Sequence, residues 1–167
     1  FRNVSGVQTC ALPIFERLRL AGAAESEIPD SLKAVEMRVT ERGPGAHPMT
    51  GPILVDGAEP GDTLEVRILE IEFLHPFGVN AFNPGTGIIP DDFPYAHFRL
   101  LRWQPGADHV DFAPNVSLKL APFFGSIGVA PPPLLGRISS RPPGWHGGNL
   151  DNKDLVAGST LYLPVHV

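Results

Sequence analysis

The densest group of chemically capable side chains lies in residues 144–155, which read GWHGGNLDNKDL. This stretch places a histidine, two asparagines, two aspartates and a lysine among three glycines. Glycine permits positive φ and a close approach of the backbone to a ligand, because it has no Cβ. Imidazole and carboxylate groups bind metal ions, and amides supply both donors and acceptors. The stretch is therefore a candidate site for a metal or a polar substrate.

The spacing within residues 144–155 predicts which side chains share a face. If the chain is extended from Asn149 onward, Asn149, Asp151 and Lys153 point to one side and the residues between them to the other. His146 would then approach the same point from a bend made by the two glycines that follow it. The alternative is an ordinary surface loop, because Asn, Asp and Gly are also common turn residues.

The stretch resembles the His-Xaa-Gly-Asn-Leu-Asp-Xaa-Lys-Asp-Leu signature of the acetamidase/formamidase family, and residues 157–165 continue the match. Two upstream stretches, residues 50–62 and 122–131, agree in order and character. The resemblance extends from His47 to Val167. Three motifs in the same order make it specific, whereas a single glycine-proline turn would not.

The resemblance implies hydrolysis of short linear amides, formamide or acetamide, to the carboxylate and ammonia. It also implies a β-rich, jelly-roll-like sandwich. Family members are considerably longer, and a Gly-Asp-Gly-His motif is expected soon after Val167. We therefore expect an internal fragment whose metal site is incomplete. The alternative function is a non-catalytic β-sandwich binding module that holds a structural metal or a polar ligand in its loops.

Amide hydrolysis favours a metal, because a metal polarises the carbonyl and lowers the pKa of bound water to about 7. Catalytic zinc usually takes about three protein ligands and keeps one position open. We predict His146 and Asp151 as ligands, with His47 from the matched upstream segment as a third. The expected ion is divalent, zinc in the first place and calcium as the alternative.

Asn149, Asp151 and Lys153 are the predicted catalytic residues. The amide of Asn149 would serve as an oxygen donor or as an oxyanion partner. Lys153 would stabilise the developing oxyanion or pair with Asp154. Because a lysine repels a nearby cation, we rank a role toward the substrate above metal ligation. Ser126 lies between two glycines, but the sequence shows no base beside it and no nucleophile elbow.

Composition limits the possible function classes. Hydrophobic residues make up 43% of the 167 residues, which is enough for a core, and the net charge of −5 argues against a nucleic-acid surface. No apolar run is long enough to span a bilayer. A single cysteine, Cys10, excludes an internal disulfide framework, so a reduced, cytoplasmic setting is expected. The expected partners are a small amide substrate and further copies of the chain in a homo-oligomer, with no nucleic acid and no membrane.

Nineteen prolines and eighteen glycines separate short apolar runs, which predicts a mainly β fold, an antiparallel sandwich or barrel. Alternation changes parity at Leu69, which predicts a β-bulge or a sharp bend near Ile68 and Leu69. A long loop is expected over residues 74–95, packed by its phenylalanines. The strands are expected at residues 53–55, 64–73, 97–103, 116–120 and 160–165, and short helical segments at 15–20 and 27–38.

Residues 1–14 differ from the rest of the chain. They show no hydrophobic period and no helix cap, and they resemble a translated adapter sequence. We expect them to be non-native and to make few buried contacts. Residues 15–167 are expected to form a partial acetamidase/formamidase-like β domain.

Overall fold

The computed structural model describes residues 14–39, 43–44, 47 and 49–167. Among these, residues 14–33 and 73–120 form one compact unit, here called the helical unit. Residues 34–72 and 121–167 form the other, here called the site unit because it contains residues 144–155. The expectation about residues 1–14 falls almost wholly outside the described residues.

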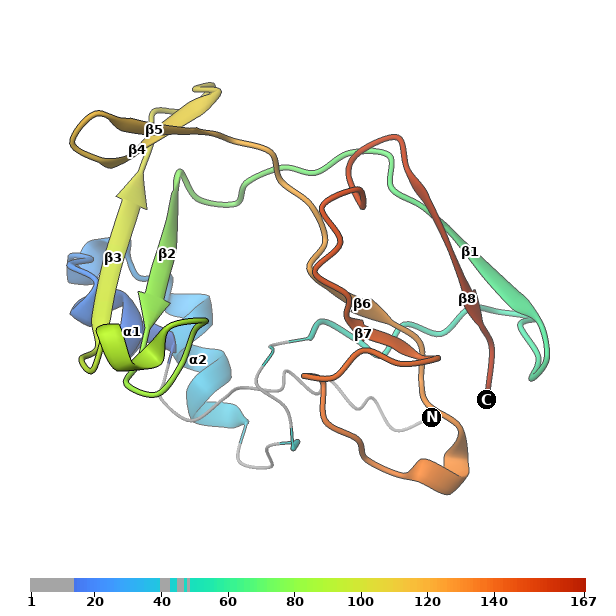
Figure 1. The fold of residues 1–167 in the computed structure, drawn as a ribbon. Helices are drawn as coiled ribbons and strands as arrows, with labels where there is room; N and C mark the ends of the chain where they lie inside the picture. The colour runs from blue at the N-terminus through green and yellow to red at the C-terminus, as the bar shows by residue number, and fades with distance from the viewer. Residues whose placement is uncertain (1–13, 40–42, 45–46, 48) are drawn as a thin grey trace. The chain divides into compact units, whose positions relative to one another are not determined.

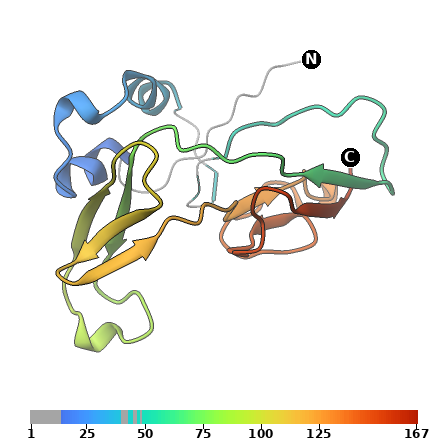
Figure 2. The same cartoon turned by 90° about the horizontal axis from the view of Figure 1, so that it is seen from above.

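The helical unit combines short helices with two β-hairpins. Helix α1 (Ile14–Leu20) and the start of α2 (Asp30–Arg38) lie beside the β2–β3 ribbon, as Figures 1 and 2 both show. Leu18, Ile28 and Leu100 form a buried apolar cluster between helix and ribbon. The elements of this unit are α1, η1 (Glu25–Glu27), the first four residues of α2, β2 (Phe77–Phe82), η2 (Pro90–Asp92), β3 (His97–Arg102), β4 (His109–Ala113) and β5 (Val116–Lys119).

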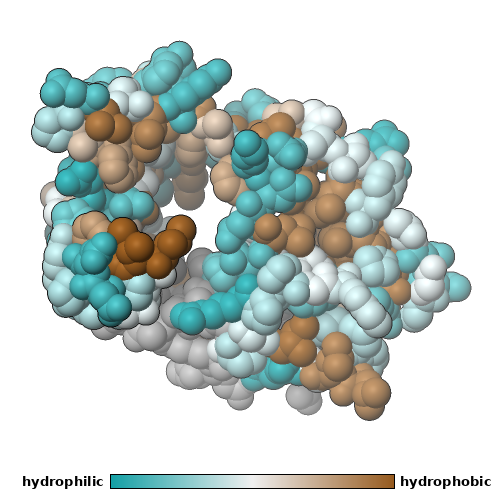
Figure 3. Space-filling model, viewed as in Figure 1, coloured by the Kyte–Doolittle hydropathy of each residue, from teal (hydrophilic) through white to brown (hydrophobic). Residues whose placement is uncertain are grey.

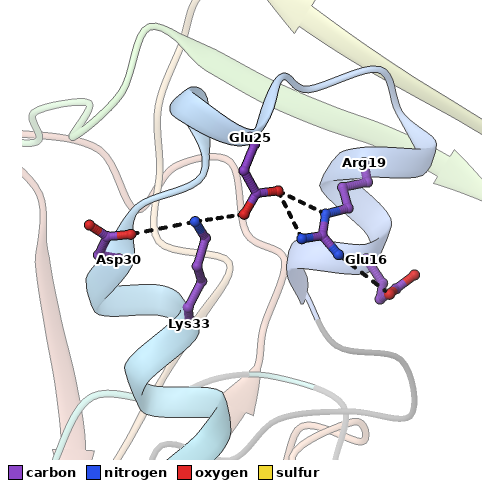
Figure 4. Close-up of polar contacts among 5 residues, drawn as sticks. All are labelled: Glu16, Arg19, Glu25, Asp30 and Lys33. Carbon is purple, nitrogen blue, oxygen red and sulfur yellow. Dashed lines mark hydrogen bonds and ion pairs between the residues drawn. The ribbon is translucent and has the colours of Figure 1, made fainter.

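Ion pairs tie the helices of this unit together. Glu25 accepts from Arg19 of α1 at 2.8 Å and pairs with Lys33 of α2 at 2.8 Å, which links three consecutive elements (Figure 4). Arg102 of β3 donates two hydrogen bonds to the carboxylate of Glu27, at 2.9 and 2.8 Å, in a bidentate arrangement. These bonds lower the pKa of Glu27 to about 2, with the guanidinium of Arg102 as the largest cause and the backbone N–H of Ala24 as the second.

The site unit contains two antiparallel ribbons. Strand β1 (Thr63–Arg67) pairs with β8 (Thr160–Pro164), and β6 (Ser126–Gly128) pairs with β7 (Gly147–Asn149). A short 3-10 helix, η3 (Pro133–Leu135), lies in the connection between β6 and β7. The segment between β7 and β8 is held by Leu155, which is buried and whose carbonyl accepts from the Phe124 N–H. Residues 150–159 therefore connect the two ribbons as an anchored loop.

Glycines make the close contact between β6 and β7 possible. Gly128 and Gly147 are register partners. A Cβ on Gly128 would lie closer than 3.0 Å to the carbonyl oxygen of His146, and one on Gly147 equally close to that of Ile127. Gly147 and Gly148 also have φ values of 85° and 91°, which L side chains rarely adopt. The ribbon can therefore form in this geometry only with glycine at these positions.

The mainly β, antiparallel class expected from the sequence is confirmed, as are both helical segments. Phe82 packs against Phe93 and Tyr95, as expected for the long loop. However, that loop contains a strand, β2, which the sequence did not predict. Strand β4 was also missed. None of the helices in the described ranges is both long and apolar enough to cross a membrane.

Two strand predictions were wrong. Residues 53–55 form no strand, and Ile53 is 81% exposed. Strand β1 ends at Arg67, and its register with β8 has no bulge. The change of parity has another cause, because the chain leaves the ribbon after Ile68. The Ile68 N–H still donates to the Ser159 carbonyl at 2.9 Å, and Ile68 is only 4% exposed. The next residue, Leu69, is 83% exposed.

The Glu27–Arg102 pair predicts a pH-dependent contribution to stability. A carboxyl with a lowered folded pKa stabilises the fold above its ordinary value of 4.5, and this stabilisation is lost as pH falls toward about 2. Glu27→Gln should therefore lower the urea midpoint at pH 7, and the difference from the unchanged protein should narrow between pH 4.5 and 2. Glu16→Gln is the control, because Glu16 makes only a 3.7 Å pair. A difference that is constant across this pH range would contradict the prediction.

The glycine contact predicts that Gly147→Ala destabilises the site unit more than Gly158→Ala does. Both positions have a φ near 90°, so both substitutions incur a backbone cost of roughly 1–2 kcal/mol. A Cβ at Gly158 meets nothing within 4 Å, whereas one at Gly147 collides with backbone. The free energies of unfolding of the two variants, measured in urea, should therefore differ by the cost of this collision. Equal losses of stability would show that the ribbon tolerates a side chain at Gly147.

Candidate functional site

The β6–β7 ribbon brings three polar side chains into a hydrogen-bonded row. Ser126 and Asn149 are register partners. The Ser126 hydroxyl donates to Asn149 Oδ1 at 3.1 Å, and Asn149 Nδ2 donates to Asp151 Oδ2 at 2.9 Å. Ser126 and Asn149 are half-buried and Asp151 is exposed, so the row runs from the ribbon to the solvent.

Asp151 reaches Asn149 through a left-handed backbone conformation. Its φ is 45°, which is uncommon for a residue other than glycine, although Asp tolerates it better than most. Its N–H donates to the Gly125 carbonyl at 3.0 Å, which fixes the turn against β6. The extended backbone assumed in the sequence analysis therefore ends at Asn149. The side chains of Asn149 and Asp151 lie together, but the left-handed backbone of Asp151 and not an extended strand brings them there.

The carboxylate of Asp151 has one oxygen held and one available. Oδ2 accepts from Asn149, whereas Oδ1 has no hydrogen bond to any residue in the described ranges. A Cβ on Gly125 would lie 3.2 Å from Oδ1, so this glycine leaves space beside the carboxylate. The arrangement holds a carboxylate in a fixed orientation with an oxygen free to accept a proton or a cation.

His146 lies in a tight turn that precedes β7. Gly144 and Gly147 exchange two backbone hydrogen bonds at 2.8 and 2.9 Å, so the turn is made by Trp145 and His146 and not by the glycines after His146 as predicted. Trp145 is 84% exposed. The imidazole lies over Gly144 and Gly148, where an added Cβ would meet its ring at 3.0–3.1 Å. No hydrogen bond joins His146 to Asp151 among the described residues.

Lys153 and His47 are not brought into the row. Lys153 is exposed, and the described residues include no ion pair between it and Asp154 or any other acid. The Nδ1 atom of His47 lies 3.0 Å from Ser140 Oγ, in the same unit. The metal-binding role of His47 and the catalytic role of Lys153 both stay predictions.

The donor set does not amount to a complete metal site. Across the described ranges, no three His, Cys, Asp or Glu side chains come close enough together to hold a metal ion. His146, Asp151 and His47 are all described, and they do not gather into such a group. The described residues therefore do not fit a three-ligand zinc centre by themselves, and metal binding by these residues stays a prediction.

Ser126 is the site residue that the sequence reasoning set aside. The sequence showed no base next to it, and the structure agrees, since its partner is the amide of Asn149. Ser126 must face Asn149 once residues 126–128 pair with residues 147–149. This pairing could not be predicted from the sequence, because both strands are only three residues long.

A separate hollow of about 670 Å³ lies in the helical unit, near Arg99, Asp111 and Asn115. The guanidinium of Arg99 is already engaged there, because it donates to the Phe112 carbonyl and lies over the Phe112 ring at 5.4 Å from the ring centroid. We assign no chemistry to it.

Comparisons with known proteins agree on one family. The family model described as the Acetamidase/Formamidase family matches residues 17–141. A formamidase from Methylophilus methylotrophus is 28% identical over 172 residues, which cover 72% of this chain and 42% of that protein.

Solved structures give the same result. An acetamidase from Bacillus halodurans is 37% identical with a TM-score of 0.65, covering 87% of this chain and 43% of its own. A recombinant predicted acetamidase/formamidase from Thermoanaerobacter tengcongensis is also 37% identical with a TM-score of 0.66, covering 72% of this chain and 38% of its own. The chain spans less than half the length of each of these relatives. Since the family model covers most of the chain, the chain belongs to the acetamidase/formamidase family.

Proposed function

We propose that the whole protein hydrolyses the C–N bond of a short linear amide, formamide or acetamide, and that residues 126–151 contribute to its site. Family membership and the names of the relatives support this substrate class. The observation that carries the proposal is the Asn149–Asp151 pair, in which an amide orients a carboxylate that keeps one oxygen free.

The proposed chemistry uses these two side chains. Asp151 Oδ1 accepts a proton from water, and the water oxygen attacks the carbonyl carbon of the amide. Asn149 Nδ2 has a second N–H beyond the one given to Asp151, and this N–H stabilises the negative oxygen that forms. The C–N bond then breaks, and the proton held by Asp151 passes to the departing nitrogen, which leaves as ammonia. The other product is formic or acetic acid, which gives its proton to ammonia or to solvent and leaves as formate or acetate.

Three further features belong to the proposal. They are binding of a divalent metal, zinc or calcium, through His146 and Asp151; assembly into a homo-oligomer; and a cytoplasmic setting. The described residues do not complete a ligand set, so no step above passes through a metal. Metal analysis of the purified whole protein, set beside its kinetics, tests the first feature independently of the reaction.

Replacing Asp151 tests the proposed base. In the whole protein, Asp151→Asn should lower kcat/KM for formamide by roughly 10²–10⁴, the usual size of a general-base contribution. Ammonia release is the measurement. Asp154→Asn is the matched control, because Asp154 lies in the same loop, is exposed, and uses only its backbone N–H in the loop's hydrogen bonds. Unchanged activity and metal content in Asp151→Asn would return the stretch to a plain glycine-rich loop.

Replacing Asn149 tests the oxyanion donor. Asn149→Ala should lower kcat by roughly 10²–10³ while KM changes little, because the lost hydrogen bond strengthens only as charge develops. The same preparations should be analysed for metal. Loss of metal together with activity would instead make Asn149 an oxygen ligand, and loss of metal in His146→Ala would place His146 in the ligand set.

A further inference from the structure

We propose that Ser126 is a positioning residue whose hydroxyl fixes the Asn149 amide so that its NH₂ group faces Asp151, and that Ser126 is not a nucleophile. The inference rests on the proposed function for its catalytic meaning. The direction of the hydrogen bonds follows from the contacts among Ser126, Asn149 and Asp151 and does not depend on the proposed function.

The direction of the row follows from donor and acceptor counting. An ionised Asp151 has only acceptors, so Asn149 must present its Nδ2 to it. The Asn149 Oδ1 atom then faces Ser126, and this oxygen can only accept. The serine must therefore donate its single proton to the amide. Each bond requires the next, and reversing the amide would place its oxygen against a carboxylate.

This direction leaves Ser126 without a base. A serine nucleophile loses its proton to an adjacent imidazole, amine or carboxylate, and an amide oxygen is far too weak to take it. No described residue other than Asn149 shares a hydrogen bond with the Ser126 hydroxyl. The geometry thus favours direct attack by water over an acyl-serine intermediate.

The test uses Ser126→Ala and Ser126→Thr in the whole protein, with Ser159→Ala as the matched control. Ser159 is a serine of the same unit whose hydroxyl donates to a backbone carbonyl, that of Val156, at 2.7 Å. Ser126→Ala should lower kcat for formamide by roughly ten- to hundredfold, as outer-shell changes do. KM should change little, because the hydroxyl acts through the amide of Asn149. Ser126→Thr should restore kcat, and the control should change neither kcat nor KM.

A second readout is independent of activity. The side-chain NH₂ signals of Asn149 in a ¹H–¹⁵N spectrum should have the same chemical shifts in the unchanged protein and in Ser126→Thr. They should move in Ser126→Ala, because without the hydroxyl the amide can turn its NH₂ group away from Asp151. If the unchanged protein releases no ammonia, the proposed function fails, and these signals still decide the orientation of the amide.

Two results would overturn the inference. Loss of all activity in Ser126→Ala, without rescue in Ser126→Thr, would make Ser126 the nucleophile. An unchanged kcat in Ser126→Ala together with unmoved Asn149 signals would make it merely a packing residue.

Discussion

The contact between two glycines of β6 and β7 is the constraint on which the site depends. Gly128 and Gly147 let their backbones approach to a distance that any Cβ would prevent. This approach sets the register that places Ser126 opposite Asn149. Because a shift by one residue turns every side chain of a strand to the opposite face, a different register would separate the serine from the amide. The glycines therefore act on the chemistry through strand pairing, without touching a substrate.

Chemical character was easier to predict from the sequence than local geometry. The density of polar side chains around Asn149 and Asp151 marked the stretch as a candidate site, and the structure joins these two side chains by a hydrogen bond. The period-two argument grouped the same two residues, but for a reason that does not apply, because Asp151 has a φ of 45°. A left-handed residue reverses the chain locally, so alternate side chains can meet without a strand. Single residues with positive φ that are not glycine leave little trace in a sequence pattern.

Strand predictions succeeded where alternation is supported by a partner of similar length. Strand β1 shows clean alternation and pairs with β8 over five residues. In contrast, β4 was missed although residues 109–112 alternate polar and apolar side chains, and its register with β5 shifts between Asp111 and Ala113. Apolar character alone misled at Ile53 and Leu69, which are exposed in the described structure. Hydrophobicity indicates which side chains would gain from burial, but the hydrogen bonds to a partner strand decide which residues form a strand.

Hydrogen-bond direction adds information that neither composition nor spacing contains. As long as the aspartate is protonated, the hydrogen bonds along a row of serine, asparagine and aspartate can run in either direction. Once Asp151 is ionised, every proton in the row is assigned, because a carboxylate cannot donate. The charge of one exposed residue thus determines the orientation of a half-buried amide and the donor role of a serine on the neighbouring strand. An isosteric change at any member of the row is therefore not conservative, since it alters the donor count that the other two must satisfy.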